Sequence, residues 1–297
     1  MEDVTVLPGK TYLTGLIGAG IGPSLSPALH EHEAAALGLR YVYRLIDIGA
    51  AGLTAASTPD LIRSARLLGF DGLNITHPGK QAAVRGVDGL SPEAAALGAV
   101  NTVVFAGGRA VGYNTDWSGF ARSLRLGLPG AALNHVVVLG AGGAGAAASY
   151  ALARLGARKV IVLDADASRA AELASSLSPE FRGHRIEHAP LEGLVRALAG
   201  ADGLVHATPT GMAAHPGIAV PAEALRPGLW VADIVYRPLE TELVRAARKA
   251  GSPTLDGGTM AVFQAADAFR LFTGTEPDIG RMLADFALLT DQETDHD

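Results

Sequence analysis

One stretch decides the fold of this chain: Val136-Val137-Val138-Leu139-Gly140-Ala141-Gly142-Gly143-Ala144-Gly145. Its first four residues are apolar, which predicts a buried strand over 136–139. The glycines that follow fit the pattern G-x-G-x-x-G, and the alanine-rich segment after them predicts a helix over 144–155. A strand, a glycine-rich turn and a helix in this order are typical of a dinucleotide-binding unit.

Each glycine of this turn has a separate physical role. Gly140 permits the tight turn, Gly142 lets the backbone approach a pyrophosphate, and Gly145 lets the helix pack closely on the strand. The start of the helix offers unpaired N–H groups and a positive dipole end to the phosphates. We therefore expect the cofactor to bind along the turn, at Gly140, Ala141, Gly142, Gly143 and Ala144. The alternative is a glycine turn with a structural role alone.

A carboxylate follows the next expected strand, 160–163. Asp164 lies nineteen positions after Gly145, where an acidic residue accepts hydrogen bonds from an adenosine ribose and repels a 2′-phosphate. The first arginine after the strand is Arg169, which we also expect at the cofactor site. The sequence therefore predicts NAD as the preferred cofactor and NADP as the alternative. Asp164 could instead cap the N-terminus of a helix.

Strands and helices alternate beyond this unit, with strands over 204–207 and 230–234 and helices over 168–177 and 240–250. Such alternation predicts a parallel sheet covered by helices on both faces. Before residue 129 we expect strands over 13–17, 41–46 and 72–75, a hairpin of 100–105 with 110–113, and helices over 28–37, 58–68, 92–97 and 117–126. The predicted fold is α/β with two domains and a cleft between them. The first domain covers 1–116, with 257–297 packed back on it through helices expected over 260–273 and 279–289, and the second is a Rossmann domain over 117–256.

The composition excludes several classes of protein. Of the 297 residues, 48% are hydrophobic and 18% charged, so the chain can form a buried core. A net charge of −6 without a basic stripe argues against a nucleic-acid partner, and the lack of cysteine excludes disulfides and cysteine-ligated metals. The uncharged stretch 136–153 contains four glycines, so a strand and a helix explain it better than a membrane span. With no apolar signal segment at the start, we expect a cytoplasmic protein without a membrane partner.

Two segments can supply an acid–base pair. Lys80 is one of only four lysines and ends the segment Asn74-Ile75-Thr76-His77-Pro78-Gly79-Lys80, while Asp116 ends Gly112-Tyr113-Asn114-Thr115-Asp116. Oxidation of a secondary alcohol needs a group that takes the hydroxyl proton, and a lysine can do so when burial and neighbours tune its pKa. The sequence alone does not show that Lys80 and Asp116 meet, and a lysine retained by chance is the alternative.

Six separated segments resemble the shikimate/quinate dehydrogenase family in order and spacing, from about residue 13 to about residue 275. They are Ser24-Leu25-Ser26-Pro27 with His30, Asn74 through Lys80, Asn101-Thr102, Asn114-Thr115-Asp116, the Gly140 turn, and Gly257 through Gln264. A joint match at six places is more specific than any single motif. The amino-acid sequence around Lys80 and Gln264 is most similar to that of the actinobacterial NAD-linked quinate/shikimate dehydrogenase branch.

The resemblance implies roles for individual residues. Lys80 and Asp116 would form the catalytic pair, without a metal. The substrate-binding residues would be Ser24 and Ser26 for a carboxylate, with Tyr236 nearby, and Thr76, Asn101 and Gln264 for ring hydroxyls. The nicotinamide would lie near Thr208, Ile234, Gly257 and Met260.

Several of these residues also have a structural interpretation. Ser24 and Ser26 could cap the helix after Pro27, and Asn101 could be an ordinary turn or strand-edge amide. The remaining two are Gln264, which could face solvent on a helix, and Tyr236, which could be a packing aromatic. His30 and His32 are two positions apart and do not share a helix face, so they do not predict a metal site.

The activity that the resemblance implies is NAD(P)-dependent oxidation of a CH–OH group. The chain would interconvert shikimate and 3-dehydroshikimate, and also quinate and 3-dehydroquinate, in aromatic amino acid biosynthesis or quinate catabolism. Asp164 and Asp166 stand where NADP-specialised members carry basic residues, which favours the NAD-linked branch. The alternatives are an aminoshikimate or aminoquinate dehydrogenase of secondary metabolism and a non-catalytic dinucleotide-binding regulator. The expected partners are a small-molecule substrate and a second copy of the chain in a homodimer.

Overall fold

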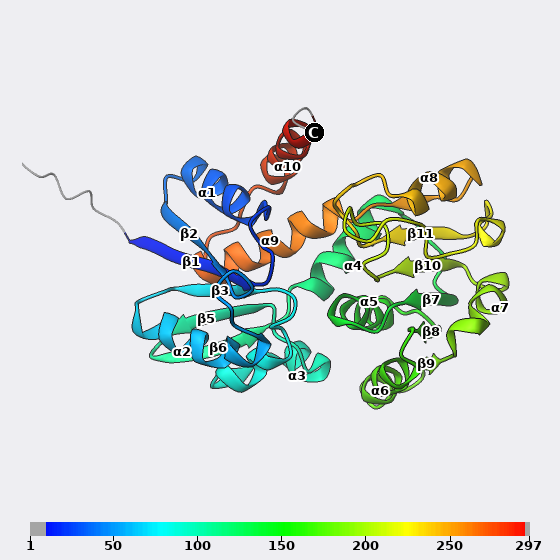
Figure 1. Ribbon diagram of the computed structural model, residues 1–297, viewed down its shortest axis with the longest axis horizontal. Helices are drawn as coiled ribbons and strands as arrows, with labels where there is room; N and C mark the ends of the chain where they lie inside the picture. Colours follow the sequence, from blue (N-terminus) through cyan, green and yellow to red (C-terminus); the bar gives the residue numbers. More distant parts are fainter. Residues whose placement is uncertain (1–9, 295–297) are drawn as a thin grey trace, which may run out of the picture. The chain divides into compact units, whose positions relative to one another are not determined.

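The computed structural model describes residues 10–294 of the chain, with side chains as far as Asp291. Two compact units make up this part of the chain. The first takes its described residues from Met1–Leu90, Val100–Tyr113 and Ala268–Asp297, and the second consists of Ser91–Ala99 and Asn114–Asp267. Each unit has its own six-stranded sheet (Figure 1).

The sheet of the first unit has the strand order β2-β1-β3-β5-β6-β4. Its strands are β1 (Thr11–Gly18), β2 (Arg40–Asp47), β3 (Gly72–Ile75), β4 (Gly89–Leu90), β5 (Thr102–Ala106) and β6 (Arg109–Tyr113). β1 pairs in parallel with β2 and β3, while β5 runs antiparallel to β3 and β6. The β5–β6 hairpin is the one expected over the glycine pair Gly107-Gly108, and both glycines have positive φ angles that L side chains rarely adopt.

The helices of the first unit each bury some apolar side chains, such as Leu29, Ile62 and Phe286. They are α1 (Ser26–Ala36), α2 (Thr58–Leu67) and α10 (Ile279–Thr294), with the 3-10 turns η1 (Ala55–Ser57) and η2 (Ala82–Gly86). Glu33 of α1 is fully buried and binds the Arg281 guanidinium of α10 through both carboxylate oxygens, at 2.7 and 2.8 Å. This ion pair joins the last helix of the chain to the first.

The second unit has a wholly parallel sheet in the order β12-β11-β10-β7-β8-β9. The strands are β7 (His135–Leu139), β8 (Lys159–Leu163), β9 (Arg185–His188), β10 (Gly203–His206), β11 (Trp230–Asp233) and β12 (Thr254–Leu255). Counted from β7, this is the order 3-2-1-4-5-6 of a Rossmann sheet. The order reverses between β7 and β10, and the crevice outside the carboxyl ends of these two strands is where such sheets bind ligands.

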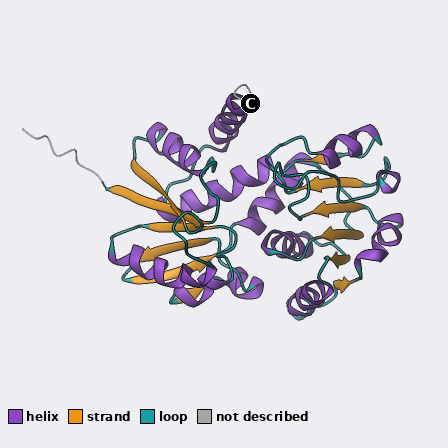
Figure 2. Ribbon diagram, viewed as in Figure 1, coloured by secondary structure: helices purple, strands orange, loops and turns teal. Residues whose placement is uncertain are grey.

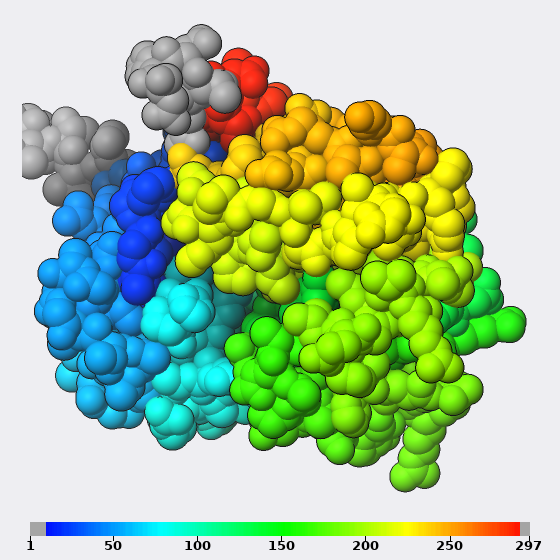
Figure 3. Space-filling view, turned by 45° about the vertical axis from the view of Figure 1, so that its right-hand side comes forward, coloured from blue at the N-terminus to red at the C-terminus, as the bar shows by residue number. Residues whose placement is uncertain are grey.

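Helices cover both faces of this sheet (Figure 2). Apolar residues of α4 (Asp116–Gly127), α5 (Gly143–Arg154) and α6 (Ala167–Leu177) pack on one face, and those of α7 (Leu194–Ala199) and α8 (Glu242–Lys249) on the other. The unit also contains α3 (Pro92–Leu97), η3 (Leu191–Gly193), η4 (Ala222–Ala224) and α9 (Gly258–Thr273) up to Asp267. The segment between β10 and β11, 207–229, forms part of its surface (Figure 3, yellow).

The predicted fold class is confirmed, because both units are α/β and the second has Rossmann topology. Every helix and strand expected by range is present, with ends shifted by a few residues. Apart from the 3-10 turns, four elements of the described residues were not predicted: β4, β9, β12 and α7, each of six residues or fewer. The cleft expected between the domains stays a prediction. Within residues 10–294, no helix is long and apolar enough to cross a bilayer.

Candidate active site

The glycine turn lies at the point where the Rossmann sheet reverses its order. Gly140 follows β7 with a φ angle of +111°, and a Cβ at this position would lie 2.6 Å from the Ala207 carbonyl oxygen beyond β10. A Cβ on Gly145 would overlap the Gly140 carbonyl oxygen. Glycine is therefore required at both positions, as the sequence predicts.

The start of α5 has no side-chain cap. Its N-cap residue is Gly142, whose backbone is extended and which has no side chain to satisfy the first N–H groups of the helix. These groups and the positive end of the helix dipole favour a phosphate. Loop and helix thus have the form that a pyrophosphate requires.

Asp164 holds the glycine turn through its side chain. Its Oδ2 accepts a hydrogen bond from the Ala141 N–H at 2.7 Å, and its Oδ1 accepts one from the Asp166 N–H at 2.9 Å. The helix-capping role belongs to Asp166, which accepts from the Ser168 N–H at 3.0 Å. Hydrogen bonds from the Ser168 hydroxyl and N–H lower the pKa of the Asp166 carboxyl. The alternative of an N-cap role for Asp164 is therefore wrong, and its carboxylate lies beside the turn.

Arg169 of α6 also reaches the turn. One of its guanidinium nitrogens lies 3.5 Å from the position that a Cβ on Gly142 would take. A carboxylate and a guanidinium thus both lie beside the turn. Both predicted cofactor residues of this region lie next to the glycines that would approach a pyrophosphate.

The other predicted cofactor residues follow β10, β11 and β12. A Cβ on Gly140 would lie 3.1 Å from Cγ2 of Thr208, which places Thr208 at the reversal point of the sheet. Ile234 donates its N–H to the His206 carbonyl at 2.9 Å, and a Cβ on Gly257 would overlap the Ile234 carbonyl oxygen. Met260 is buried in the core of the unit. Tyr236, predicted to lie near the substrate carboxylate, is 36% exposed.

The loop after β1 in the first unit is fixed by a single carboxylate. Asp47, at the end of β2, accepts hydrogen bonds from the N–H groups of Gly20 and Ile21 at 3.2 and 3.1 Å, and from Gly49 and Ala50 as well. These backbone hydrogen bonds, that of Ala50 first, lower the pKa of the Asp47 carboxyl. Further along the loop, the hydroxyl of Ser24 accepts from the Ser26 N–H at 3.3 Å. The loop therefore presents Ser24 and Ser26 from a defined backbone.

A buried chain of hydrogen bonds leads from this loop to Asn101. Tyr43 donates its hydroxyl to Asn74 Oδ1 at 2.9 Å, and the amide of Asn74 donates to the Thr102 hydroxyl at 3.2 Å. Thr102 in turn donates to Asn101 Oδ1 at 3.0 Å. Burial raises the pKa of the Tyr43 hydroxyl well above its usual value, and a hydrogen bond with Ser26 opposes this shift. The Asn101 side chain thus takes part in a buried network, and its role toward a substrate stays a prediction.

The segment that carries Lys80 is held by backbone contacts. The Thr76 N–H donates to the Ile17 carbonyl at 2.9 Å, and the Lys80 carbonyl accepts from the Val100 N–H at 2.9 Å. Gly79 is packed so closely that a Cβ there would lie 2.9 Å from the Thr58 hydroxyl oxygen. Lys80 itself is half-buried. Within the first unit, the backbone of Lys80 thus lies beside that of Val100, the residue before Asn101.

Asp116 is positioned by the residues directly before α4. The Asn114 side chain accepts from the Asp116 N–H at 3.1 Å and donates to the Ala99 carbonyl at 3.1 Å, which fixes the turn into the helix. The Asp116 residue is 6% exposed. Gln264 packs on Gly119 of the same helix and donates its amide to the Ala261 carbonyl at 3.0 Å. Gln264 is thus partly buried, and its role toward a substrate stays a prediction.

The predicted substrate and catalytic residues of the first unit come from the same end of its sheet. They lie after β1, after β3 or directly before β5: Ser24, Ser26, Thr76, Lys80 and Asn101. Asp116, Gln264 and Tyr236 belong to the second unit. The meeting of Lys80 and Asp116 stays a prediction. Sequence reasoning missed Tyr43, Asp47 and the buried pair His206–Asp233, which carry no motif of their own.

The histidines of α1 have structural surroundings. His30 is fully buried among aromatic rings, and its Nδ1 lies 3.0 Å from the Tyr41 hydroxyl. Burial lowers the pKa of His30 to about 3, so the ring is neutral. In the part of the chain that the structure describes, no group of three histidine, aspartate or glutamate side chains is arranged to hold a metal ion.

Comparison with known proteins identifies the family. Residues 16–103 match the model of the shikimate dehydrogenase substrate binding domain, and residues 126–216 match that of shikimate / quinate 5-dehydrogenase. The shikimate dehydrogenase (NADP(+)) of Streptomyces avermitilis is 64% identical over 94% of this chain and 96% of its own length. The chain belongs to the shikimate/quinate dehydrogenase family. Its members are NAD(P)-dependent oxidoreductases that act on a hydroxyl group.

The relatives that are similar to the chain include enzymes named for NADP(+) and enzymes named for NAD(+). The quinate/shikimate dehydrogenase (NAD(+)) of Corynebacterium glutamicum is 49% identical over 94% of this chain and 99% of its own length. A solved structure of quinate dehydrogenase from Corynebacterium glutamicum in complex with NAD superposes with a TM-score of 0.88. That structure is 48% identical and covers 94% of this chain and 99% of its own. The family predicted from six sequence segments is thus confirmed.

Proposed function

We propose that this protein interconverts shikimate and 3-dehydroshikimate, and quinate and 3-dehydroquinate, with NAD as the preferred cofactor and NADP as a weaker one. Membership of the dehydrogenase family supports the reaction type. The observation that carries the cofactor preference is the Asp164 carboxylate, which binds the Ala141 N–H at the glycine turn. A carboxylate at this place accepts ribose hydroxyls and repels a 2′-phosphate.

The dinucleotide fits the second unit. A Cβ on Gly140 or Gly145 would overlap a backbone carbonyl oxygen, while among the described residues only the Arg169 guanidinium lies within 4 Å of the Cβ position of Gly142. The start of α5 offers N–H groups to phosphates. Thr208, Ile234, Gly257 and Met260 follow the neighbouring strands and would flank the nicotinamide. When bound, the dinucleotide accepts the hydride that leaves the substrate carbon.

Lys80 and Asp116 are the proposed catalytic residues. In the oxidative direction the neutral amine of Lys80 takes the proton from the C3 hydroxyl, and in the reductive direction the ammonium returns it. The Asp116 carboxylate has no proton to donate, so it can accept hydrogen bonds from the ammonium and from the hydroxyl. A positioned group of this kind is worth roughly 10²–10⁴ in rate.

The substrate is a small acid with several hydroxyl groups, and the first unit supplies neutral donors and acceptors for it. Ser24 and Ser26 would bind the carboxylate, with Tyr236 nearby, and Thr76, Asn101 and Gln264 would bind ring hydroxyls. The buried network from Tyr43 to Asn101 supports this assignment, because it fixes the rotamers of the side chains that select the substrate.

The test is a matrix of steady-state rates with shikimate and quinate, each against NAD and NADP. Asp164→Ser should lower the ratio of kcat/KM for NAD over NADP by roughly tenfold or more, since a hydrogen bond to a charged group is lost and a repulsion removed. Glu180→Gln is the control, because it removes an exposed negative charge beyond the C-terminal end of α6, away from the glycine turn, and the ratio should not change. Better turnover with NADP by the wild-type protein would overturn the NAD preference.

An aminoshikimate or aminoquinate dehydrogenase is not favoured, because the relatives described above are named for shikimate and quinate. The amino analogues belong in the same rate matrix, where a higher kcat/KM than for shikimate would reverse this conclusion. A non-catalytic regulator is likewise not favoured, since the chain retains both Lys80 and Asp116.

Domain boundaries, quaternary structure and location complete the proposal. We propose residues 1–116 and 257–297 as the substrate domain and 117–256 as the dinucleotide domain, a division that differs from the two compact units at residues 91–99, 114–116 and 257–267. We also propose a homodimer in the cytoplasm. Sedimentation of the purified protein measures the oligomeric state, and a monomer at micromolar concentration would contradict the homodimer.

A further inference from the structure

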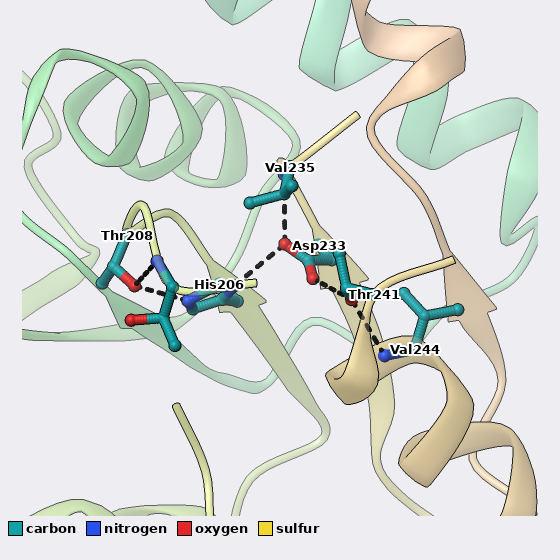
Figure 4. A network of polar contacts seen from close by, with 7 residues as sticks. His206, Thr208, Asp233, Val235, Thr241 and Val244 are labelled. Atoms are coloured by element: carbon teal, nitrogen blue, oxygen red, sulfur yellow. Dashed lines mark hydrogen bonds and ion pairs between the residues drawn. The ribbon is translucent and has the colours of Figure 1, made fainter. Parts of the chain in front are cut away.

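A buried polar network supports the residue that follows β10 at the reversal point of the Rossmann sheet. His206 ends β10 and is paired in register with Asp233 at the end of β11. Their side chains are 1% and 0% exposed, and His206 Nδ1 lies 2.9 Å from Asp233 Oδ1. On the other side of the ring, His206 Nε2 lies 2.6 Å from the Thr208 hydroxyl oxygen (Figure 4).

The contacts of Asp233 fix which ring nitrogen carries the proton. Asp233 accepts from the Val235 N–H at 3.1 Å and from the Thr241 hydroxyl at 2.6 Å, while the Thr241 hydroxyl also accepts from the Val244 N–H at 3.2 Å (Figure 4). The Thr241 hydroxyl therefore donates its only proton to the Asp233 carboxylate. A carboxylate only accepts, so Nδ1 of His206 must donate to it. In a neutral imidazole the remaining nitrogen, Nε2, is then an acceptor.

The hydrogen bonding of Thr208 follows from this tautomer. Its hydroxyl donates to His206 Nε2, and its oxygen accepts from the Thr210 N–H at 3.3 Å. The single hydroxyl proton is used, and one lone pair of the oxygen is left. The Cγ2 methyl of Thr208 lies against Gly140 of the glycine turn, so the side chain lies at the reversal point of the sheet, where the ligand crevice is expected.

We propose that His206 is a positioning residue that turns the Thr208 hydroxyl so that it accepts, and does not donate, a hydrogen bond at the dinucleotide site. The matching group on the ligand is an N–H or O–H donor, which the carboxamide and ribose hydroxyls of a dinucleotide supply and a phosphate does not. This inference rests on the proposed function in one respect, namely that the ligand of this crevice is a nicotinamide dinucleotide.

Direct binding of NADH by calorimetry tests the inference without turnover. Thr208→Val removes the hydroxyl and should raise the Kd by roughly three- to tenfold, the worth of one hydrogen bond. Thr208→Ser should bind nearly as the parent does. His206→Asn keeps an amide that can donate to Asp233 but has no acceptor near Thr208, so its Kd should rise by a similar factor.

The double variant separates positioning from general damage. Because His206 acts through Thr208, the variant with both His206→Asn and Thr208→Val should bind NADH no more weakly than Thr208→Val alone. Additive losses would overturn the proposal, as would tight binding by His206→Asn. If His206→Asn does not fold, His206→Gln tests the same point: its amide oxygen can accept from Thr208, and a Kd raised as in Thr208→Val would overturn the proposal.

A matched control is available on the same sheet. His135 begins β7 at the opposite edge, where Nδ1 lies 2.9 Å from the Gly200 carbonyl oxygen, so His135→Asn should leave the Kd for NADH within about twofold. A comparable loss in His135→Asn would show that any such histidine substitution weakens binding, and would overturn the proposal. Failure of the wild-type protein to bind NADH at all would instead contradict the proposed function.

Discussion

The two units present their functional groups in different ways. In the first unit, the functional groups are side chains that other side chains orient. A buried chain of hydrogen bonds from Tyr43 through Asn74 and Thr102 orients Asn101. In the second, the backbone of the glycine turn would provide the ligand surface, and side chains such as Asp164 hold that backbone. The difference agrees with the ligands proposed above, because a pyrophosphate is recognised by N–H groups and a polyhydroxylated acid by many separate polar side chains.

The largest effect that the comparison predicts is at Lys80, the one side chain that would move a proton. Lys80→Ala should lower kcat by roughly 10²–10⁴ while the Kd for NADH stays nearly unchanged. Lys249→Ala, at the exposed end of α8, is the matched control and should keep the parental rate. Turnover by Lys80→Ala near the parental rate would show that Lys80 does not transfer the proton.

Acid should destabilise the first unit through His30. Burial lowers the pKa of His30 from 6.5 to about 3. Between these two pH values the imidazole is protonated in the unfolded chain and neutral in the folded protein. The stability gained by a neutral His30 is therefore complete above about pH 6.5 and is lost as the pH falls toward 3, at about 1.4 kcal/mol per pH unit. Urea unfolding between about pH 7 and about pH 5 measures this slope.

The matching variant is His30→Phe, which should flatten the slope because it removes the titrating group. His32→Phe, on the exposed side of the same helix, should keep the slope of the parent. An unchanged slope in His30→Phe would assign the acid sensitivity to other groups.

A smaller effect is expected within the network of the first unit. Tyr43→Phe leaves Asn74 Oδ1 without its donor, and a buried acceptor without a partner costs about 1–3 kcal/mol. The KM for shikimate should rise severalfold and the Kd for NADH should not change. Tyr12→Phe is the control, since its half-buried hydroxyl donates only to the Thr273 carbonyl. Equal changes in both variants would mean that the network has no special connection with substrate binding.

The same difference explains what the sequence could predict. Glycines at fixed spacing are visible because only glycine fits positions where a Cβ would overlap a carbonyl oxygen, as at Gly145. Asp164 was placed correctly by its distance from the turn, and the fold class by strand–helix alternation. Resemblance to a family supplied the residues of the first unit, such as Lys80 and Asn101.

Supporting residues without a local pattern could not be predicted. Tyr43 alternates with its neighbours like any strand residue, and its contact with Asn74 joins positions that are 31 residues apart. His206 and Asp233 end two separate strands and meet only because β10 and β11 are paired in register. Short elements such as β9 and β12 were missed because so few residues show no periodicity.

The division of tasks between the units is tested most directly by calorimetric titration of Gly145→Ala with NADH and, separately, with shikimate. A Cβ at residue 145 would overlap the Gly140 carbonyl, so the Kd for NADH should rise by roughly tenfold or more while that for shikimate stays within about twofold. Gly193→Ala, where a Cβ would meet nothing within 4 Å, should change neither constant. Equal weakening of both ligands, or undiminished binding of NADH, would contradict the account.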